Sequence, residues 1–544
     1  GGPRAYVCRV PWLVVVGATE NPRRVYVGSY LMGLAVFLVN VRWLTPVTVG
    51  GYIALAAYLA IYFPLMACPL RHAVRRRGIP LVIAVPVIWV GNEFVRALAL
   101  TGFPWFYLGH TQYEFHTLIQ ISDLVGAYGV SFLVAAVNGL LAAWFLGRGA
   151  ADGPAVRRRW RGSLIAASLL ILATVIYGQI QLHRDTSTVG PRVAVFQRDF
   201  PHFVERRGNT LSPTQQAQAY FDLVEQVSNE PIDIYLFPET PWPMRLNPEF
   251  RNLDTTSPSI PGNLRRSILE SQYFFDQFHR LAREREATVV VGAIFQQHTP
   301  LDLFAGSRQH NSAFIFRPDG GEPDRYDKVH CVFFGEVVPF RYGHLRFLYL
   351  WLNDLMPFGR DGYEYSLTPG TEFKLYSMTP HSQADRSYRF GVPICYEDVM
   401  PYISREFVTA PDGAKQADFL LNISNDGWFI HSDELSQHLA ICAFRAVENR
   451  VGIARAVNTG ISGFIDPNGR IYDRVTVDGV AQGAGIEGVR VANLILDSRH
   501  SLYSRIGDLF AKICTATWIL LYVDYLLVRS LGRRGGASKG ELTP

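Results

Sequence analysis

Long apolar stretches occupy both ends of the chain. A helix needs about 20 mostly apolar residues to cross the hydrocarbon core of a bilayer. Residues 5–18 are apolar but too short to span reliably, and the over-long fourth stretch is expected to begin along the membrane interface. The pattern predicts six membrane-spanning helices, at residues 25–41, 47–66, 79–100, 117–146, 162–182 and 509–528.

The middle of the chain has a different pattern, in which short strand-like runs alternate with helical ones. Such alternation favours an α/β fold whose sheets are covered by helices. The predicted strands are 192–196, 234–237, 288–295, 312–316, 389–394, 418–423, 453–457 and 463–465, and the predicted helices are 215–228, 266–285 and 434–449. Residues 243–265 are expected to form a loop or insertion. The domains predicted are a membrane bundle at 1–182, an α/β domain at 183–508, and a final helix with its tail at 509–544.

Charge separates the same regions. The 544 residues carry a net charge of +5, yet residues 1–182 hold 15 Lys/Arg against 5 Asp/Glu and residues 509–544 hold 5 against 2. The middle region is therefore acidic, with a net charge of −8. An acidic domain repels a polyanion, which argues against nucleic acid as a partner.

The loops between the predicted spans alternate in charge. Loops 19–24, 67–78, 147–161 and 529–544 carry 2, 4, 5 and 4 Lys/Arg, whereas loops 42–46 and 101–116 carry 1 and 0. The positive-inside rule puts the first group in the cytoplasm, so the middle region is expected on the outer side. This alternation disfavours a soluble protein with buried core helices.

Three residues of the middle region supply complementary chemistry. A thiol that attacks a carbonyl needs a base to take its proton and a cation to stabilise the oxyanion. Cys395, Glu239 and Lys328 supply these parts, each at a predicted strand end or loop. Taken singly, each residue has a commoner structural explanation. Cys395 could be a buried thiol, Glu239 a surface acid and Lys328 a solvated lysine. Glu336 lies among apolar residues and needs a partner or a role.

Other arrangements compete with this one. The six cysteines do not form a disulfide framework, since an odd number fall in the middle region. His438 and Cys442 are four residues apart on a predicted helix, a spacing that suits metal ligands, but helix packing is the better account. A serine hydrolase is weakly supported, because the G-x-S-x-G match at residues 536–540 lies in the predicted C-terminal tail. The aromatic loop 102–113 fits either an interfacial belt or a surface that faces lipid or substrate.

The order of these motifs resembles the carbon–nitrogen hydrolase (nitrilase) superfamily and, with the helices, its membrane branch, the apolipoprotein N-acyltransferase family. The resemblance covers nearly the whole chain. The matching pieces are Phe-Pro-Trp-Phe-Tyr-Leu-Gly-His-Thr-Gln, Phe-Pro-Glu-Thr, His-Asn-Ser-Ala, Tyr-Asp-Lys-Val-His, Phe-Gly-Glu-Val-Val-Pro-Phe, Ile-Cys-Tyr-Glu, Asn-Ile-Ser-Asn-Asp-Gly-Trp-Phe, Gln-His-Leu and Asn-Thr-Gly-Ile-Ser.

The resemblance implies a fold, a location and a reaction. It implies an αββα sandwich on the outer side of a helical bundle in the bacterial cytoplasmic (inner) membrane. The bundle of the family has more helices than the six predicted here, which predicts a further helix before residue 1 or a variant bundle. The implied reaction moves a fatty acyl group from a phospholipid, through a Cys395 thioester, to the α-amine of a diacylglyceryl-cysteine on a lipoprotein. A monomer without metal or cofactor is expected.

The supporting residues follow from the same resemblance. Glu336 and Glu397 are expected to orient Lys328 and the second nucleophile. The backbone N–H of Tyr396 is expected to assist Lys328 at the oxyanion. The acyl pocket is expected to be shaped by Asn311, Tyr396 and Trp428.

The chain departs from the family pattern in places. Gln197-Arg198-Asp199 replaces Gln-Gly-Asn, and Val204-Glu205-Arg206 stands where a tryptophan is expected. These changes put the lipid contacts of that arm in doubt, but they leave Glu239, Lys328 and Cys395 in place.

Two other function classes remain open. A membrane-tethered nitrilase-type amidase would pass its acyl group to water instead of an amine. A scaffold or transporter without catalysis would form no thioester at Cys395, and the few charges within the predicted helices give transport little support.

Overall fold

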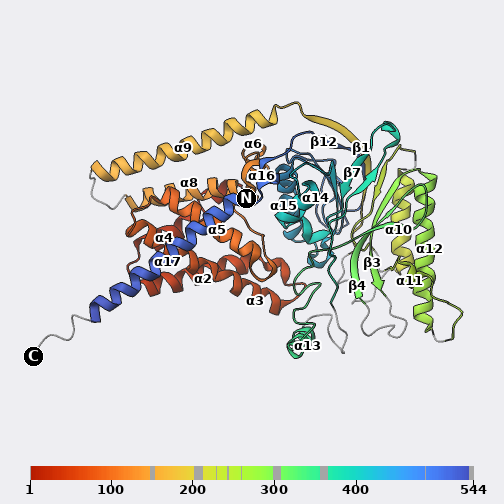
Figure 1. Cartoon of the computed structure of the whole chain (residues 1–544), viewed down its shortest axis with the longest axis horizontal. Helices are drawn as coiled ribbons and strands as arrows, with labels where there is room; N and C mark the ends of the chain where they lie inside the picture. The colour runs from red at the N-terminus through yellow and green to blue at the C-terminus, as the bar shows by residue number, and fades with distance from the viewer. Residues whose placement is uncertain are drawn as a thin grey trace, which may run out of the picture. The chain divides into compact units, whose positions relative to one another are not determined.

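A computed structural model describes residues 2–147, 154–200, 212–227, 229–241, 244–258, 260–297, 308–355, 366–483 and 485–537. The chain divides into two compact units, one made of Gly1–Arg184 with Ser501–Pro544 and the other of Asp185–His500. Each unit is described by itself. In Figure 1 the first unit contains the red, orange and dark blue helices, and the second contains the sheets.

The first unit is helical. Its α-helices are α1 (Val10–Ala18), α2 (Pro22–Asn40), α3 (Val49–Ala60), α4 (Tyr62–Arg75), α5 (Leu81–Leu98), α6 (His116–Ile119), α7 (Ser122–Val125), α8 (Ala127–Gly147), α9 (Pro154–Leu182), α16 (Leu502–Ile506) and α17 (Leu509–Ala537). Short 3₁₀ helices are η1 (Gly2–Tyr6), η2 (Arg42–Leu44), η3 (Ala99–Thr101) and η4 (Gly109–Gln112).

Within the described residues, five helical segments are long and apolar enough to cross a membrane, namely Val49–Arg75, Leu81–Leu98, Ala127–Gly147, Arg158–Leu182 and Leu509–Ser530. They overlap five of the six predicted spans. The sixth predicted span, at 25–41, falls in α2, which is not one of these five segments. The first turn of α2 contains Arg23 and Arg24.

The predicted span at 117–146 is interrupted. Two short helices, α6 and α7, precede Gly126, whose φ of 70° is left-handed, and α8 begins only at Ala127. A Cβ at Gly126 would lie 2.8 Å from the ring of Tyr503 in α16. The break therefore lets α16 pack closely, and only the second part of this stretch is a long helix.

The bundle is held by close helix contacts around α5. A Cβ at Gly91 would lie 3.0 Å from the Cα of Thr515, so α5 and α17 approach at a point where only glycine fits. Loop 102–113 also packs inside this unit: Trp105 and Tyr107 are buried, and the hydroxyls of Tyr107 and Tyr128 are 3.1 Å apart. These two aromatic side chains therefore serve packing and do not lie in an exposed belt.

The second unit contains two six-stranded sheets, with strand orders β12-β1-β2-β3-β4-β5 and β11-β10-β9-β8-β7-β6. The strands are β1 (Ser187–Gln197), β2 (Ile234–Leu236), β3 (Thr288–Gln297), β4 (Arg308–Phe316), β5 (Asp324–Asp327), β6 (Tyr376–Met378), β7 (Tyr388–Gly391), β8 (Phe419–Asn425), β9 (Gly452–Asn458), β10 (Gly463–Ile465), β11 (Ile471–Tyr472) and β12 (Gly488–Asp497). The helices are α10 (Pro213–Gln226), α11 (Pro248–Arg251), α12 (Gly262–Glu284), α13 (Arg346–Leu355), α14 (Pro401–Val408) and α15 (Glu434–Asn449), with 3₁₀ helices η7 (His381–Gln383), η8 (Cys395–Asp398) and η9 (Asp426–Phe429).

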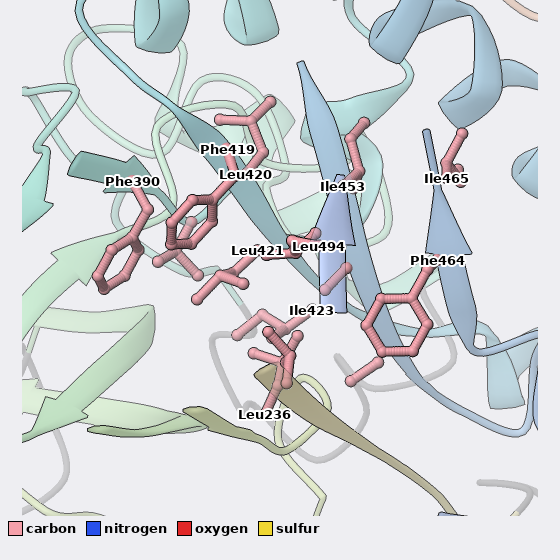
Figure 2. Close-up of a cluster of buried hydrophobic side chains, with 14 of the residues drawn as sticks. Leu236, Phe390, Phe419, Leu420, Leu421, Ile423, Ile453, Phe464, Ile465 and Leu494 are labelled. Atoms are coloured by element: carbon pink, nitrogen blue, oxygen red, sulfur yellow. The ribbon is translucent and has the colours of Figure 1, made fainter. Parts of the chain in front are cut away.

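Alternation along β1 shows how the layers form. Val193 and Val195 join the core shared by the two sheets, while Ala194 and Phe196 join a cluster under α10 and α12. Figure 2 shows Leu236 of the first sheet pointing toward residues of the second, and Figure 1 shows α10 and α12 covering β3 and β4. Residues of α14 and α15 join the second sheet's core. The layers are αββα, which confirms the predicted class of a helical membrane bundle plus a nitrilase-like sandwich.

Candidate active site

Cys395 lies at a sharp turn after β7. It opens η8 with a φ of 51°, a left-handed conformation that is unusual for a residue with a side chain. The preceding Ile394 forms a bridge with Ile423 of β8, which fixes the entry to the turn. Such strain persists only where the surrounding structure enforces it, and it is common at functional sites. The thiol is half-buried.

Glu239 follows β2 and is buried, with 5% of its surface exposed. Its loop lies directly on Gly292 in β3, where a Cβ would come within 2.6 Å of the Glu239 Cα. The N–H of Gly292 donates to the carbonyl of Pro238 at 3.2 Å. The close approach fixes the backbone from which the carboxylate projects.

Lys328 follows β5 and is 1% exposed. Its Nζ donates to Glu336 Oε1 at 2.9 Å and to Glu239 Oε1 at 3.4 Å. Asn311 of β4 lies between the same two acids, and its Nδ2 donates to Glu239 at 2.5 Å and to Glu336 at 2.9 Å. The N–H of Val332 donates to the other oxygen of Glu336 at 2.7 Å. Glu336 therefore has the partner that its apolar surroundings require.

The electrostatics of the three predicted residues are coupled. Burial raises the pKa of Glu239 and Glu336 adds to the increase, while Lys328, Asn311 and a hydrogen bond with Cys395 lower it. Burial raises the pKa of the Cys395 thiol well above its usual range, and the charge of Glu239 adds to this. Burial alone would lower the pKa of Lys328, but the two carboxylates raise it well above its usual value. The raised pKa of the thiol favours its neutral form, and the two carboxylates favour the charged form of Lys328.

Glu397 connects the Cys395 turn to the segment that follows Lys328. Its Oε1 accepts from the N–H of Val329 at 2.7 Å, the N–H of His330 at 3.1 Å and the Tyr326 hydroxyl at 2.8 Å, and its Oε2 accepts from the N–H of Ile394 at 2.8 Å. Burial raises the pKa of Glu397 to about 7 despite these donors. The carboxyl therefore holds together the two segments that carry the nucleophile and the cation.

Two further predicted residues lie in the 3₁₀ helices η8 and η9. Tyr396 follows Cys395 in η8, and its ring stacks on that of His330 with centroids 5.9 Å apart. Trp428 is half-buried in η9, after β8, two residues beyond Asp426. The charge of Asp426 raises the pKa of Cys395, so η9 lies within electrostatic reach of the thiol.

A buried ionic cluster connects η8, η9, α15 and β9, and the sequence pattern does not indicate it. His438 Nε2 lies 2.7 Å from Asp398 and its Nδ1 lies 3.1 Å from Asp426. The Arg455 guanidinium contacts the same two carboxylates, at 2.5 and 3.3 Å. The two carboxylates, acting against burial and the charge of Arg455, raise the pKa of His438 to about 10.

The same cluster bears on metal binding. Asp426, Glu434 and His438 each offer a ligand atom within 4.8 Å of the others. Burial and the charge of Asp426 raise the pKa of Glu434 well above its usual value. Arg455 contacts Asp426 and Asp398, so a cation of the chain itself already lies at this cluster. Cys442 forms a hydrogen bond with Asp398, which also contacts His438. The two α15 residues that stand four apart in the sequence therefore share one carboxylate partner.

The three residues that depart from the family pattern, Gln197, Arg198 and Asp199, are each held by a contact with another segment of the α/β unit. Gln197 donates to the Ile486 carbonyl at 2.7 Å, Arg198 pairs with Glu487 at 3.2 Å, and Asp199 lies 2.9 Å from His431 Nε2. Residues 204–206 lie outside the described residues, as do parts of the predicted loop 243–265, within which α11 forms.

Comparisons with known proteins agree along the chain. The model of the carbon–nitrogen hydrolase family matches residues 192–492, and that of the apolipoprotein N-acyltransferase N-terminal domain matches residues 2–140. A protein of Geobacter metallireducens named apolipoprotein N-acyltransferase is 31% identical over 94% of this chain and 89% of its own length. A protein of Rhodopirellula baltica with the same name is 27% identical over 95% of this chain and 93% of its own length. A protein of Treponema denticola named apolipoprotein N-acyltransferase 1 is 25% identical over 95% of this chain and 90% of its own length.

Proposed function

The chain belongs to the apolipoprotein N-acyltransferase family, within the carbon–nitrogen hydrolase superfamily, and we propose that it N-acylates lipoproteins through a thioester on Cys395. The acyl donor is a membrane phospholipid. The acceptor is the α-amino group of the diacylglyceryl-cysteine at the lipoprotein N-terminus. The single observation that carries the proposal is the buried contact of Glu239, Lys328 and Cys395, in a chain that also has membrane-spanning helices.

In the first half-reaction, Glu239 takes the thiol proton as Cys395 Sγ attacks the ester carbonyl carbon of the phospholipid. The C–O ester bond then breaks, the proton passes from Glu239 to the leaving oxygen, and lysophospholipid departs. The raised pKa of Glu239 supports this role, because a more basic carboxylate takes a proton more readily. The raised pKa of the thiol makes a base such as Glu239 necessary for the attack.

In the second half-reaction, the acceptor amine attacks the thioester carbonyl. Glu239 takes a proton from the amine, the C–S bond breaks, and the proton returns to the Cys395 sulfur as the amide forms. The same carboxylate therefore serves both steps. Its hydrogen bonds with Asn311 and Lys328 hold it in one position throughout.

Both half-reactions pass through a tetrahedral oxyanion. Lys328 has three N–H donors, and Glu239 and Glu336 engage two of them, which leaves one to point at the oxyanion. The backbone N–H of Tyr396 supplies the second donor. Tyr396 and Trp428 shape the acyl pocket with Asn311, and Glu397 keeps the Cys395 turn in register with Lys328.

The membrane favours an amine over water as the second nucleophile. Both substrates carry acyl chains and are confined to the bilayer surface, which raises their effective concentration at a monomeric enzyme held there. The loop charges favour an inner-membrane protein whose α/β domain faces the periplasmic side. A thioester shielded from water survives until the amine arrives.

A product assay separates this proposal from a membrane-tethered amidase. The protein in vesicles receives phospholipid with a labelled acyl chain and a synthetic diacylglyceryl-cysteinyl peptide. We expect N-acylated peptide and lysophospholipid in equal amounts. Labelled free fatty acid without acylated peptide, or turnover of simple amides to acid and ammonia, contradicts the transferase proposal.

A further inference from the structure

Arg455 is a buried arginine that the reaction above does not use. It lies in β9, with 1% of its surface exposed. Its register partner in the neighbouring strand β8 is Asn422, which is also buried. Strand β7, which leads into the Cys395 turn, lies on the other side of β8. A buried guanidinium is costly unless its N–H groups are satisfied, so its partners show what it holds in place.

The Arg455 guanidinium is connected to the Cys395 turn on both sides of the thiol. Its Nη1 donates to Asp398 Oδ2 at 2.5 Å, and Asp398 ends the 3₁₀ helix η8 that Cys395 opens. The same nitrogen donates to the side-chain oxygen of Asn422. Asn422 Nδ2 donates in turn to the carbonyl of Pro393 at 3.2 Å, two residues before Cys395. Arg455 therefore connects β9, directly or through Asn422, to the residues that enter and leave the left-handed turn.

The other edge of the guanidinium contacts η9. Arg455 Nη2 lies 3.3 Å from Asp426 Oδ2, and Asp426 opens η9. His438 of α15 contacts Asp398 and Asp426 as well, at 2.7 and 3.1 Å. A planar guanidinium presents its N–H donors at fixed angles and can hold two carboxylates at once, whereas an ammonium is a point charge. Arg455 and His438 therefore hold η8 and η9 together.

The charge of Arg455 also acts on the thiol. Burial raises the pKa of the Cys395 thiol most, and of the charged groups around it one cation lowers that pKa and three carboxylates raise it, namely Lys328 against Glu239, Asp426 and Glu336. Burial acts to lower the pKa of Arg455, while the nearby carboxylates and the thiolate form of Cys395 raise it. This interaction is mutual, so the guanidinium favours the thiolate that forms during attack.

We propose that Arg455 is a positioning residue that holds the Cys395 turn in place and supports the thiolate during attack. This role rests on the function proposed above, because thioester formation is the step that needs the thiol in place. Arg455 is shielded from a substrate by its burial and acts through Asp398 and Asn422. Its loss should therefore slow acylation of Cys395 without changing the phospholipid concentration that gives half the maximal rate.

Alkylation and acylation of Cys395 in the full-length protein test the two parts of this role. Mass spectrometry of Cys395 peptides measures the rate of alkylation by iodoacetamide across the neutral and alkaline range, and the single-turnover rate of acyl transfer from a labelled phospholipid. The variants are Arg455→Lys, which keeps the charge, Arg455→Gln, which removes it, and Asp426→Asn, which removes one carboxylate. Arg445→Lys is the matched control, because Arg445 is also buried in this unit but pairs with Glu448 of its own helix, α15, at 2.9 Å.

We expect both Arg455 variants to lower the acylation rate about 10- to 100-fold at an unchanged half-saturating phospholipid concentration, because a displaced nucleophile loses its attack geometry. The alkylation profile should move to higher pH in Arg455→Gln, which loses a cation near the thiolate, and to lower pH in Asp426→Asn, which loses an anion. It should move less in Arg455→Lys. Arg445→Lys should match the parent in both measurements, even where its thermal stability falls.

Parental acylation rates in folded Arg455→Lys and Arg455→Gln proteins overturn the positioning role, as does equal slowing in Arg445→Lys, which would assign the effect to stability. Alkylation profiles that do not move in opposite directions in Arg455→Gln and Asp426→Asn overturn the support of the thiolate. If the Arg455 variants fail to fold, Asn422→Ser, which cuts the connection to Pro393, decides, since a parental acylation rate there overturns the proposal. A parent protein that is alkylated at Cys395 but never carries an acyl group contradicts the proposed function instead, and the alkylation profiles still decide whether Arg455 supports the thiolate.

Discussion

Replacing Glu336 by glutamine tests whether that carboxylate tunes the proposed base. The side chain keeps its shape, and its oxygen can still accept from Lys328, but one buried negative charge disappears. Glu336 raises the pKa of Glu239, so its removal should lower that pKa. The acidic limb of the activity profile should therefore move to lower pH. The maximal rate should fall about tenfold, because a less basic carboxylate takes the thiol proton less readily.

The size of the repulsion between the two carboxylates follows from the geometry. The Oε1 atoms of Glu239 and Glu336 both contact Asn311 Nδ2, at 2.5 and 2.9 Å, so they lie no more than about 5 Å apart. At an effective dielectric constant of about 20, two unit charges at that separation repel by about 3 kcal/mol. The acidic limb should therefore move by an amount that a pH profile resolves, in the direction of lower pH.

The assay measures kcat/KM for transfer from a fluorescent phospholipid across the acidic and neutral range, because the limb of kcat/KM reports the base in the free enzyme. Glu372→Gln, which removes a more exposed acid paired with Lys374, is the control and should leave the profile unchanged. A folded Glu336→Gln protein with a slower rate but an unmoved acidic limb would refute the electrostatic reasoning. Glu336 would then act only by holding Lys328.

Further predictions concern the packing and the ionic cluster around the site. Gly292→Ala should lower the free energy of unfolding by about 1–3 kcal/mol and slow transfer, because its Cβ would lie 2.6 Å from the Glu239 Cα. Thermal unfolding measures this loss. The control is Gly262→Ala, whose Cβ would meet nothing within 4 Å and which should be neutral. Asp398→Asn breaks a buried pair with Arg455 and should cost about 3–5 kcal/mol by the same measurement. The pKa of His438 is raised to about 10, so its contribution to stability is present below its unfolded pKa of about 6.5 and is lost as pH rises toward 10. Stability should therefore fall over that window, and His438→Gln should flatten the slope; an equal slope in both proteins would contradict the assignment.

Local patterns in the sequence predicted much of the architecture. The helix predicted at 434–449 coincides with α15, because its apolar face repeats at helical spacing and is buried against the second sheet. The strands that precede Glu239 and Cys395 form where expected, since their apolar runs fill the core between the sheets. Glu239 and Lys328 were grouped by their complementary chemistry, and the structure brings them within 3.4 Å.

Features that depend on distant partners could not be predicted from local patterns. Strand β12 was missed because it is defined by antiparallel pairing with β1, almost 300 residues earlier. The partners of His438 come from Asp398 and Asp426, on separate turns, so its spacing to Cys442 alone gave no sign of the cluster. At the interruption, Gly126 allows the close approach of Tyr503, and an apolar stretch gives no signal of such a contact.

The most direct test of the account is whether Cys395 carries the acyl group. The protein is incubated with a phospholipid that has a labelled acyl chain, without acceptor, and Cys395 peptides are analysed by mass spectrometry. We predict one acyl group on Cys395, its loss on addition of the diacylglyceryl-cysteinyl peptide, and none in Cys395→Ala. Cys331→Ser, which changes another half-buried thiol, should label like the parent. Equal labelling of Cys395→Ala, or transfer without any thioester at Cys395, would contradict the central claim.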